Sequence, residues 1–214
     1  MAEPFPPLYA IVDPLDTGRP PQALAAALLA GGARLLQLRL KSAPARVLLA
    51  EARAMRALTR QYGARLIVND RPDVAAAAAA DGVHLGQDDL PLAAARAILP
   101  PGTMVGISTH DLEQARLAAQ AGADYIAIGP VFSTTTKPDA LTPRGLALVG
   151  TVRAAVPCPV VAIGGISLER AATVRAAGAD AIAMIGALVR APDPSAAVRA
   201  VLRALQSRPA SGSA

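Results

Sequence analysis

The feature that most constrains the fold is a strict alternation between two kinds of segment along the chain. Short apolar, often β-branched runs alternate with alanine- and leucine-rich stretches that carry scattered Arg and Glu. The short runs are typical of buried strands, and the longer stretches are typical of helices. The predicted strands span residues 8–13, 35–41, 66–70, 82–86, 104–108, 125–129, 160–164 and 181–185. Clear examples of the helical stretches span residues 43–60, 112–121, 168–177 and 194–205.

Eight strands in alternation with eight helical segments indicate parallel βαβ units, whose sheet is covered on both faces. Eight such repeats in 214 residues predict an α/β fold, a single-domain (β/α)8 TIM barrel. A doubly wound open sheet is the alternative, but no Gly-x-Gly-x-x-Gly follows the first strand to support it. We expect the barrel to span residues 1–206 and the tail, residues 207–214, to be disordered.

Composition narrows the class of protein. The chain is 53% hydrophobic and 17% charged, which is too apolar for a disordered protein. Its longest apolar runs are too short to span a membrane. The first residues carry neither a basic leader nor a signal-length apolar run, and the single cysteine, Cys158, excludes a disulfide framework. We therefore expect a cytoplasmic protein with no membrane partner.

The net charge of +5 suggests an anionic partner. The basic residues are scattered singly, and three Tyr and two Phe without any Trp offer no stacking platform, which argues against nucleic acid. A small anionic ligand suits the charge better. Almost all basic residues are arginines, so the two lysines, Lys41 and Lys137, and the single asparagine, Asn69, stand out as candidate site residues.

Polar side chains collect at the predicted carboxyl ends of the strands, where barrels of this type hold their active sites. In the second strand Gln37, Arg39 and Lys41 are spaced two residues apart, which places them on one face. The intervening leucines suit the helix layer, so we expect the three polar side chains to point into the barrel mouth. Two cations beside an amide favour a polyanionic ligand.

Acidic residues follow the third and fourth strands. Asp70 comes directly after Asn69, and Asp88 and Asp89 follow the fourth strand. Each suits a helix cap, and we expect capping to account for one of them. Two acids at neighbouring strand ends also suit Mg²⁺, which takes one or two carboxylates and completes its shell with water and phosphate oxygens. His84, within the fourth strand, is expected to be a hydrogen-bonded barrel histidine rather than a ligand.

Hydroxyl residues and glycines follow the later strands. After the sixth strand come a serine, three threonines and Lys137, which suit a loop that covers a ligand. Glycines end the seventh and eighth strands, and loops there often bind phosphate. Ser108 and His110 lack an acid at triad spacing, so no nucleophile is expected. A monophosphate site beside a pyrophosphate site predicts a reaction that joins two substrates and releases pyrophosphate.

Six strings carry a resemblance to a known family: QLRLK, VNDRPDVA, ADGVHLGQDDL, GISTH, GADYIAIGPVFSTTTKPDA and AIGGI. In order and spacing they resemble thiamine phosphate synthase, over about residues 8–205. The resemblance implies a transferase that joins hydroxymethylpyrimidine pyrophosphate to thiazole phosphate with Mg²⁺, giving thiamine phosphate and pyrophosphate. It also implies a dissociative mechanism, in which pyrophosphate leaves first and the thiazole nitrogen traps a pyrimidinylmethyl cation.

The resemblance further implies roles for residues of this chain. Those implied to bind the pyrimidine substrate and its pyrophosphate are Gln37, Arg39, Lys41, Asn69, Ser108 and Lys137. Among them Arg39, Ser108 and Lys137 would stabilise the leaving group and the cation. Those implied to hold Mg²⁺ are Asp70 and Asp89. Those implied to bind the thiazole phosphate are Thr134, Thr135, Thr136, Gly165, Ile185 and Gly186.

Two residues depart from the family pattern. Leu40 stands where the family more often has an acidic residue, and we expect little loss because Leu40 should face the helix layer. Gly186 stands where the family often has serine, so it offers its N–H to the thiazole phosphate but no hydroxyl.

Two other members of this barrel family are the alternatives. The thiazole tautomerase branch tends to lack the acid at Asp70 and to carry a histidine where Pro130 stands. A non-catalytic sensor of thiazole phosphate would not need the cations and acids of the pyrophosphate site. The sequence leaves open the preferred thiazole tautomer and the oligomeric state, a homo-oligomer included.

Overall fold

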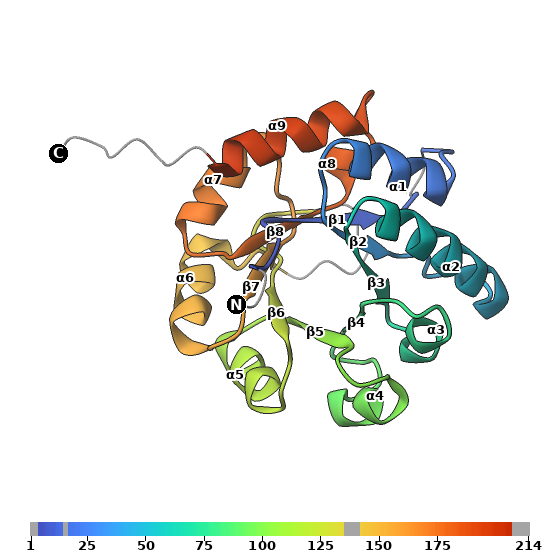
Figure 1. The fold of residues 1–214 in the computed structure, drawn as a ribbon. Coiled ribbons are helices and arrows are strands. Elements are labelled where there is room, and N and C mark those ends of the chain that lie inside the picture. The colour runs from blue at the N-terminus through green and yellow to red at the C-terminus, as the bar shows by residue number, and fades with distance from the viewer. Residues whose placement is uncertain (1–3, 15–16, 135–141, 207–214) are drawn as a thin grey trace.

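A computed structural model describes residues 4–14, 17–134 and 142–206, and within them eight parallel strands close into a barrel in chain order (Figure 1). The predicted (β/α)8 fold is confirmed. The strands are β1 (Leu8–Val12), β2 (Leu35–Leu38), β3 (Arg65–Asn69), β4 (Gly82–Leu85), β5 (Met104–Thr109), β6 (Tyr125–Ile128), β7 (Val160–Ile163) and β8 (Ala181–Met184). Leu8 of β1 pairs with Ile182 of β8, which closes the ring.

Helices surround the strands on the outside (Figure 1). They are α1 (Pro21–Ala30), α2 (Ala45–Gln61), α3 (Pro72–Ala77), α4 (Leu92–Ile98), α5 (Leu112–Gln120), α6 (Gly145–Ala155), α7 (Leu168–Ala176), α8 (Gly186–Val189) and α9 (Pro194–Gln206). The described residues thus hold one helix more than the eight predicted, because a single turn, α8, follows β8 directly. In Figure 1 the last helix, α9, lies beside α1 and completes the outer layer.

The strands are buried along nearly their whole length, since side chains on one face fill the barrel and those on the other pack under the helices. This burial explains why the sequence shows continuous apolar runs. The described residues contain no helix that is both long and apolar enough to cross a bilayer. The expected tail, residues 207–214, lies outside the described residues.

The predicted second strand was too long. β2 ends at Leu38, and Leu40 already opens a turn by accepting a hydrogen bond from the Ala43 N–H at 3.2 Å. Arg39 extends the ladder by one bond, from its N–H to the Val12 carbonyl at 3.0 Å. Strand alternation therefore positions Gln37 and Arg39, whereas a turn positions Lys41. Leu40 is half-buried and packs against the apolar core.

The amino-terminal end of the barrel is fastened by three similar sets of contacts, which we call basal clasps. In each clasp an aspartate just before an even-numbered strand accepts a hydrogen bond from a backbone N–H in the preceding strand and pairs with an arginine of the preceding even-numbered helix. The three aspartate, N–H and arginine sets are Asp81, Leu66 and Arg56; Asp124, Val105 and Arg96; and Asp180, Val160 and Arg153. The N–H bonds measure 2.7, 2.6 and 2.8 Å.

Candidate functional site

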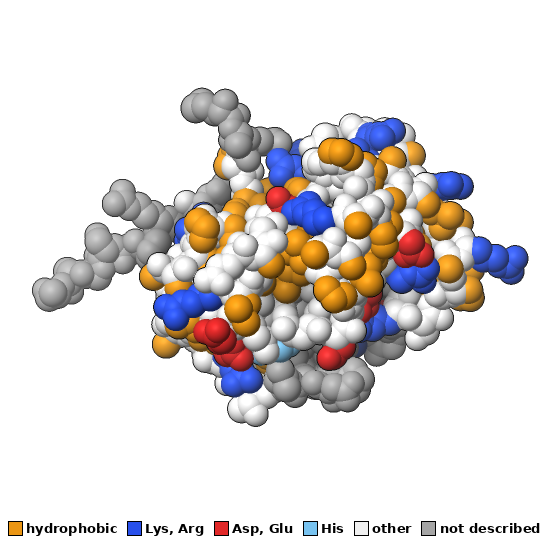
Figure 2. All heavy atoms as spheres, turned by 90° about the horizontal axis from the view of Figure 1, so that it is seen from below, with side chains coloured by type: hydrophobic (Ala, Val, Ile, Leu, Met, Phe, Trp, Pro, Cys, Tyr) orange, Lys and Arg blue, Asp and Glu red, His pale blue; other side chains and the backbone are white. Residues whose placement is uncertain are grey.

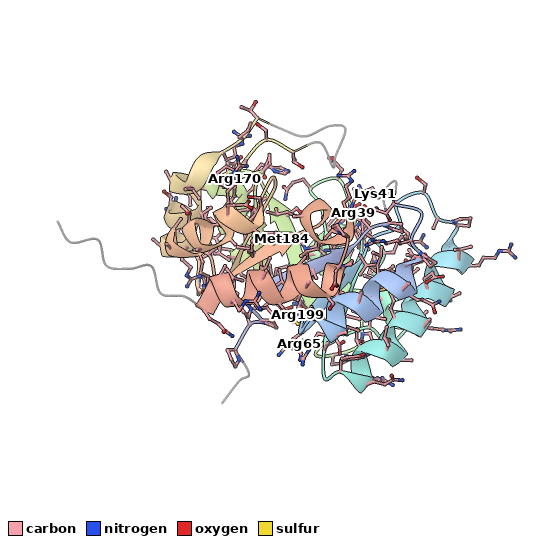
Figure 3. The ribbon with its side chains drawn as sticks, turned by 90° about the horizontal axis from the view of Figure 1, so that it is seen from above. Arg39, Lys41, Arg65, Arg170, Met184 and Arg199 are labelled. Carbon is pink, nitrogen blue, oxygen red and sulfur yellow. The ribbon has the colours of Figure 1, made fainter. Side chains whose placement is uncertain are left out.

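An open pocket lies at the carboxyl ends of the strands, as the barrel fold predicts. Eight of the residues to which the family resemblance gives a role line this one pocket: Gln37, Arg39, Lys41, Asn69, Asp70, Asp89, Ser108 and Ile185. Figure 3 shows Arg39 and Lys41 at one end of the barrel and Arg65, which begins β3, at the other. The pocket therefore belongs to the end opposite the basal clasps.

The two cations of the pocket are held differently. Arg39 forms an ion pair with Asp13, and each side chain is only 11% exposed, so the guanidinium is fixed. Lys41 is 57% exposed, and its Nζ lies 3.5 Å from an Asp70 carboxylate oxygen. Sequence reasoning missed Asp13, although its place just after β1 was a usable signal. The pocket thus combines one fixed cation with one that is free to adjust.

The two acids implied as metal ligands do not cap helices. Asp70 has φ of 62°, a left-handed conformation that Asp tolerates better than most residues, and its N–H donates to the His84 carbonyl at 2.8 Å. Helix α3 begins after Arg71 and helix α4 after Pro91, neither of which makes a side-chain cap. Asp89 accepts a hydrogen bond from the Gly86 N–H at 2.6 Å instead. The expectation that capping accounts for one of the acids was wrong.

Burial raises the pKa of Asp70 above its ordinary value, and the neighbouring Asp89 carboxyl raises this pKa further. Lys41 offsets only part of this shift. Two close carboxyl groups, one of them partly buried, make a place where a cation is favourable. The described residues hold no group of three or more His, Cys, Asp or Glu side chains that suits a metal ion. Two carboxylates still fit Mg²⁺, whose remaining ligands are commonly water and substrate phosphate.

A continuous chain of hydrogen bonds crosses the barrel interior beneath the pocket. The Gln37 amide donates to the Tyr9 hydroxyl at 2.8 Å, and the Tyr9 and Tyr125 hydroxyls are 3.0 Å apart. The Tyr125 hydroxyl lies 3.0 Å from His84 Nδ1, and His84 Nε2 lies 2.8 Å from Ser108 Oγ. The prediction that His84 is a hydrogen-bonded barrel histidine is confirmed.

The sequence analysis did not identify either tyrosine of this hydrogen-bond chain. Tyr9 and Tyr125 are fully buried, and burial raises the pKa of each hydroxyl above its ordinary value, so both stay protonated. Each lies within an apolar strand, where an aromatic residue indicates packing. The available signal was that two of only three tyrosines lie in strands of a barrel interior that offers few hydrogen-bond partners.

The loops after β6, β7 and β8 form the neighbouring wall. Gly165 has φ of 61°, and a Cβ there would lie 2.3 Å from the Ser133 carbonyl, so only glycine lets the two loops meet. Arg170 lies 4.4 Å above the Phe132 ring and donates to the Gly165 carbonyl at 2.9 Å, which fastens the same contact. Figure 3 places Arg170 at the same end of the barrel as Arg39.

Of the residues implied to bind the thiazole phosphate, only some line the pocket. Ile185 lines the pocket and is the residue from which α8 begins, at Gly186. Thr134, Gly165 and Gly186 do not line it. Thr135, Thr136 and Lys137 lie outside the described residues.

Comparison with known proteins gives a consistent answer. The model of the thiamine monophosphate synthase family matches residues 8–188. A thiamine-phosphate synthase of Chloroflexus aurantiacus is 49% identical over 201 residues, which cover 94% of this chain and 92% of the relative. One from Moorella thermoacetica is 48% identical over 193 residues, which cover 90% and 92%. The solved thiamine phosphate pyrophosphorylase of Pyrococcus furiosus superposes with a TM-score of 0.85 at 38% identity, covering 92% of this chain and 94% of that one.

Proposed function

This chain belongs to the thiamine monophosphate synthase family, and from that premise we propose that its barrel mouth joins hydroxymethylpyrimidine pyrophosphate to thiazole phosphate. The products are thiamine phosphate and pyrophosphate, so the chain is a transferase of thiamine biosynthesis. The single observation that carries this assignment to the site is one pocket lined by both cations, both acids and the Gln37 amide. A cytoplasmic location remains a prediction.

The pyrimidine pyrophosphate is proposed to bind over strands β2 to β5. Arg39, held by Asp13, and the exposed Lys41 present positive charge to the pyrophosphate. Gln37, Asn69 and Ser108 offer amide and hydroxyl groups to the pyrimidine end. Lys137 would add a third cation from the loop after β6. This arrangement suits a substrate whose reactive end carries most of its charge.

Asp70 and Asp89 would hold Mg²⁺ against the pyrophosphate. Their carboxyls are neighbours, and burial together with the Asp89 carboxyl raises the pKa of Asp70 despite the nearby Lys41, which supports a role for the pair in binding a cation. When bound, the metal supplies charge neutralisation for the departing pyrophosphate. The pyrophosphate oxygens would complete the metal's shell, which explains why a two-carboxylate site suffices.

The thiazole phosphate is proposed to bind at the loops after β6, β7 and β8. Gly165, Ile185 and Gly186 would offer backbone N–H groups, and Thr134 to Thr136 would offer hydroxyls. Ile185, from which the short helix α8 begins, lines the pocket and supports this placement, because phosphate sites of barrels commonly use the loops after the last two strands. The nitrogen of the thiazole ring would then face the pyrimidine across the mouth.

The chemistry follows from charge rather than from a nucleophile. Arg39, Lys137 and Ser108 would stabilise the leaving pyrophosphate and the pyrimidinylmethyl cation, which forms between the two anion sites as the carbon–oxygen bond breaks. The thiazole nitrogen then forms the new carbon–nitrogen bond. Preorganised donors of this kind act without reorganisation, and removing one commonly costs about 10²- to 10³-fold in rate.

The test is pyrophosphate release by the purified protein, measured with each substrate alone and with both, with and without Mg²⁺. We expect release only when both substrates and the metal are present, with thiamine phosphate as the second product. Binding of thiazole phosphate without pyrophosphate release would overturn the proposal and favour the sensor. Conversion of one thiazole tautomer into another without release would favour the tautomerase.

A further inference from the structure

We propose that Tyr9, Tyr125 and His84 form a positioning relay that makes the Ser108 hydroxyl a hydrogen-bond donor toward the pyrimidine pyrophosphate. The inference rests on the proposed function, since it concerns the substrate of that site. Tyr9 and His84 line the pocket and Tyr125 does not, but the role proposed for all three is to position Ser108 rather than to contact the substrate. They act through Ser108 at one end of the hydrogen-bond chain, while Gln37 anchors the other end.

Which group donates in each of these hydrogen bonds follows from the number of protons that each group carries. The Gln37 Nε2 group can only donate, so the Tyr9 oxygen accepts and the Tyr9 proton needs an acceptor of its own. Among the described residues that acceptor is Tyr125, because the Tyr9 hydroxyl has no other hydrogen-bond partner there. The opposite direction would leave a buried hydroxyl proton without an acceptor, which is costly.

The same reasoning carries on to Ser108. Since the Tyr125 oxygen accepts from Tyr9, its own proton goes to His84 Nδ1. His84 is then the neutral tautomer with its proton on Nε2, and it donates to Ser108 Oγ at 2.8 Å. The Ser108 oxygen is thereby occupied as an acceptor, and its proton is directed into the pocket. A buried amide on β2 thus sets the polarity of a hydroxyl on β5.

Packing keeps the relay in one arrangement. The His84 ring stacks on Tyr125 at 5.6 Å, and Tyr9 meets Tyr125 edge-on at 5.8 Å. Gly106 makes room for the Tyr125 ring, since a Cβ at residue 106 would lie 1.9 Å from its Cζ atom. Because the rings are fixed, only the positions of the hydroxyl and imidazole protons can vary, and the hydrogen bonds that begin at Gln37 determine these positions.

The substrate group addressed by Ser108 must therefore be a hydrogen-bond acceptor. Phosphate oxygens and the ring nitrogens of a pyrimidine are acceptors, whereas an exocyclic amino group is a donor. The relay thus favours a pyrimidine pyrophosphate oriented with an acceptor atom toward β5. It contributes to orientation and affinity for this substrate, and it has no direct effect on the thiazole phosphate.

The test is a double-mutant cycle between Tyr125→Phe and Ser108→Ala, read as kcat/KM for each substrate. Tyr125→Phe keeps the ring but removes the proton that His84 Nδ1 accepts, so His84 can turn to its other tautomer and compete for the Ser108 proton. We expect each single variant to lose about tenfold or more in kcat/KM for the pyrimidine substrate. The double variant should lose no more than the worse single variant, and the KM for thiazole phosphate should not change.

Independent, multiplying losses would overturn the relay, as would a Tyr125→Phe variant with normal kinetics. Tyr62→Phe removes the same hydroxyl from an exposed tyrosine and serves as the matched control. If Tyr125→Phe fails to fold, His84→Gln and His84→Asn replace it, because a Gln amide can reach Ser108 and an Asn amide cannot. Gln is then expected to retain more activity than Asn, and equal losses would count against the relay. A wild-type protein that releases no pyrophosphate would instead defeat the proposed function itself.

Discussion

Asp70 is a single residue whose proposed role in metal binding lowers the stability of the metal-free protein. Its carboxyl has a raised pKa because it is partly buried beside Asp89. Because the pKa of Asp70 is higher in the folded than in the unfolded state, the protonated carboxyl adds to the free energy of unfolding at low pH, below the ordinary carboxyl pKa. That contribution is lost as pH rises through the raised pKa. At neutral pH the metal-free protein therefore holds a charge pair that works against folding.

We predict that Asp70→Asn abolishes turnover, with a loss of at least about 10²-fold, yet stabilises the metal-free protein at neutral pH. Denaturant unfolding between pH 4 and 7 checks this, because the advantage of the variant should grow as pH rises. Mg²⁺ with pyrophosphate should raise the melting temperature of the wild type and not that of the variant.

Asp73→Asn is the matched control, since Asp73 lies three residues further on, is exposed and pairs with Arg71 on the surface. It should leave turnover unchanged. Near-normal turnover of Asp70→Asn in saturating Mg²⁺ would remove Asp70 from the metal site.

Lys137 gives a second prediction at this scale, based on the family resemblance alone because the residue lies outside the described ranges. As a stabiliser of the leaving pyrophosphate, Lys137 acts mainly in the transition state. Lys137→Ala is therefore expected to lower kcat more than it weakens thiazole phosphate binding. Steady-state kinetics beside equilibrium binding of thiazole phosphate separates the two effects, and an unchanged kcat would refute the role.

How far the sequence predicts single residues depends on the signal that each carries. Gln37 and Arg39 were predictable because polar side chains at a strand end have few structural explanations. Asp13 received no weight because a lone acid after a strand is common. Tyr9 and Tyr125 were hidden, since a tyrosine in an apolar strand has the same pattern as a packing residue. Only the fold shows that their hydroxyls meet.

At the scale of elements, the contact between the loops after β6 and β7 depends on one glycine. Gly165→Ala would need a left-handed alanine and would bring its Cβ against the Ser133 carbonyl. We predict a several-fold rise in KM for thiazole phosphate with a smaller change for the pyrimidine substrate. Gly63→Ala is the control, because Gly63 also has positive φ but no atom within 4 Å of its Cβ position. An equal effect on both substrates would show that the loop does not belong to the thiazole side.

Element boundaries were the least predictable part of the fold. Lys41 was assigned to a strand because alternation of polar and apolar residues continues past Leu38, yet the chain turns at Leu40. The single-turn helix α8 was missed because four residues, Gly186 to Val189, are too few to show helical periodicity. In both cases the local sequence carries no mark of the boundary.

The whole molecule separates chemistry from stability along the barrel axis. The pocket occupies the carboxyl ends of the strands, and the basal clasps occupy the amino-terminal ends. The basic side chains visible in Figure 2 are spread over the surface rather than gathered into one patch. Substitutions at the two ends should therefore have different effects.

We predict that Asp124→Ala lowers stability without changing kcat. The substitution removes the acceptor of the Val105 N–H and the partner of Arg96, which costs about 1–3 kcal/mol and about 2–4 °C in melting temperature for each kcal/mol. Thermal unfolding and steady-state kinetics on the same preparation check both halves.

Asp124→Asn keeps an acceptor for the N–H and should lose less stability than Asp124→Ala. A fall in kcat at temperatures where the variant is fully folded would contradict the separation of the two ends.

The clasps also bear on the order in which the chain folds. In each clasp the hydrogen bond from the backbone N–H to the aspartate joins residues only 15 to 20 positions apart, so it can form inside a single strand–helix–strand unit. The arginine is added from the helix just before that unit. The seam between β1 and β8 joins Leu8 to Ile182, and the described residues show no clasp there. Loop closure is slower over longer stretches of chain. Refolding should accordingly build strands β3 to β8 as three preassembled pairs and leave the meeting of the first and last strands as its final event.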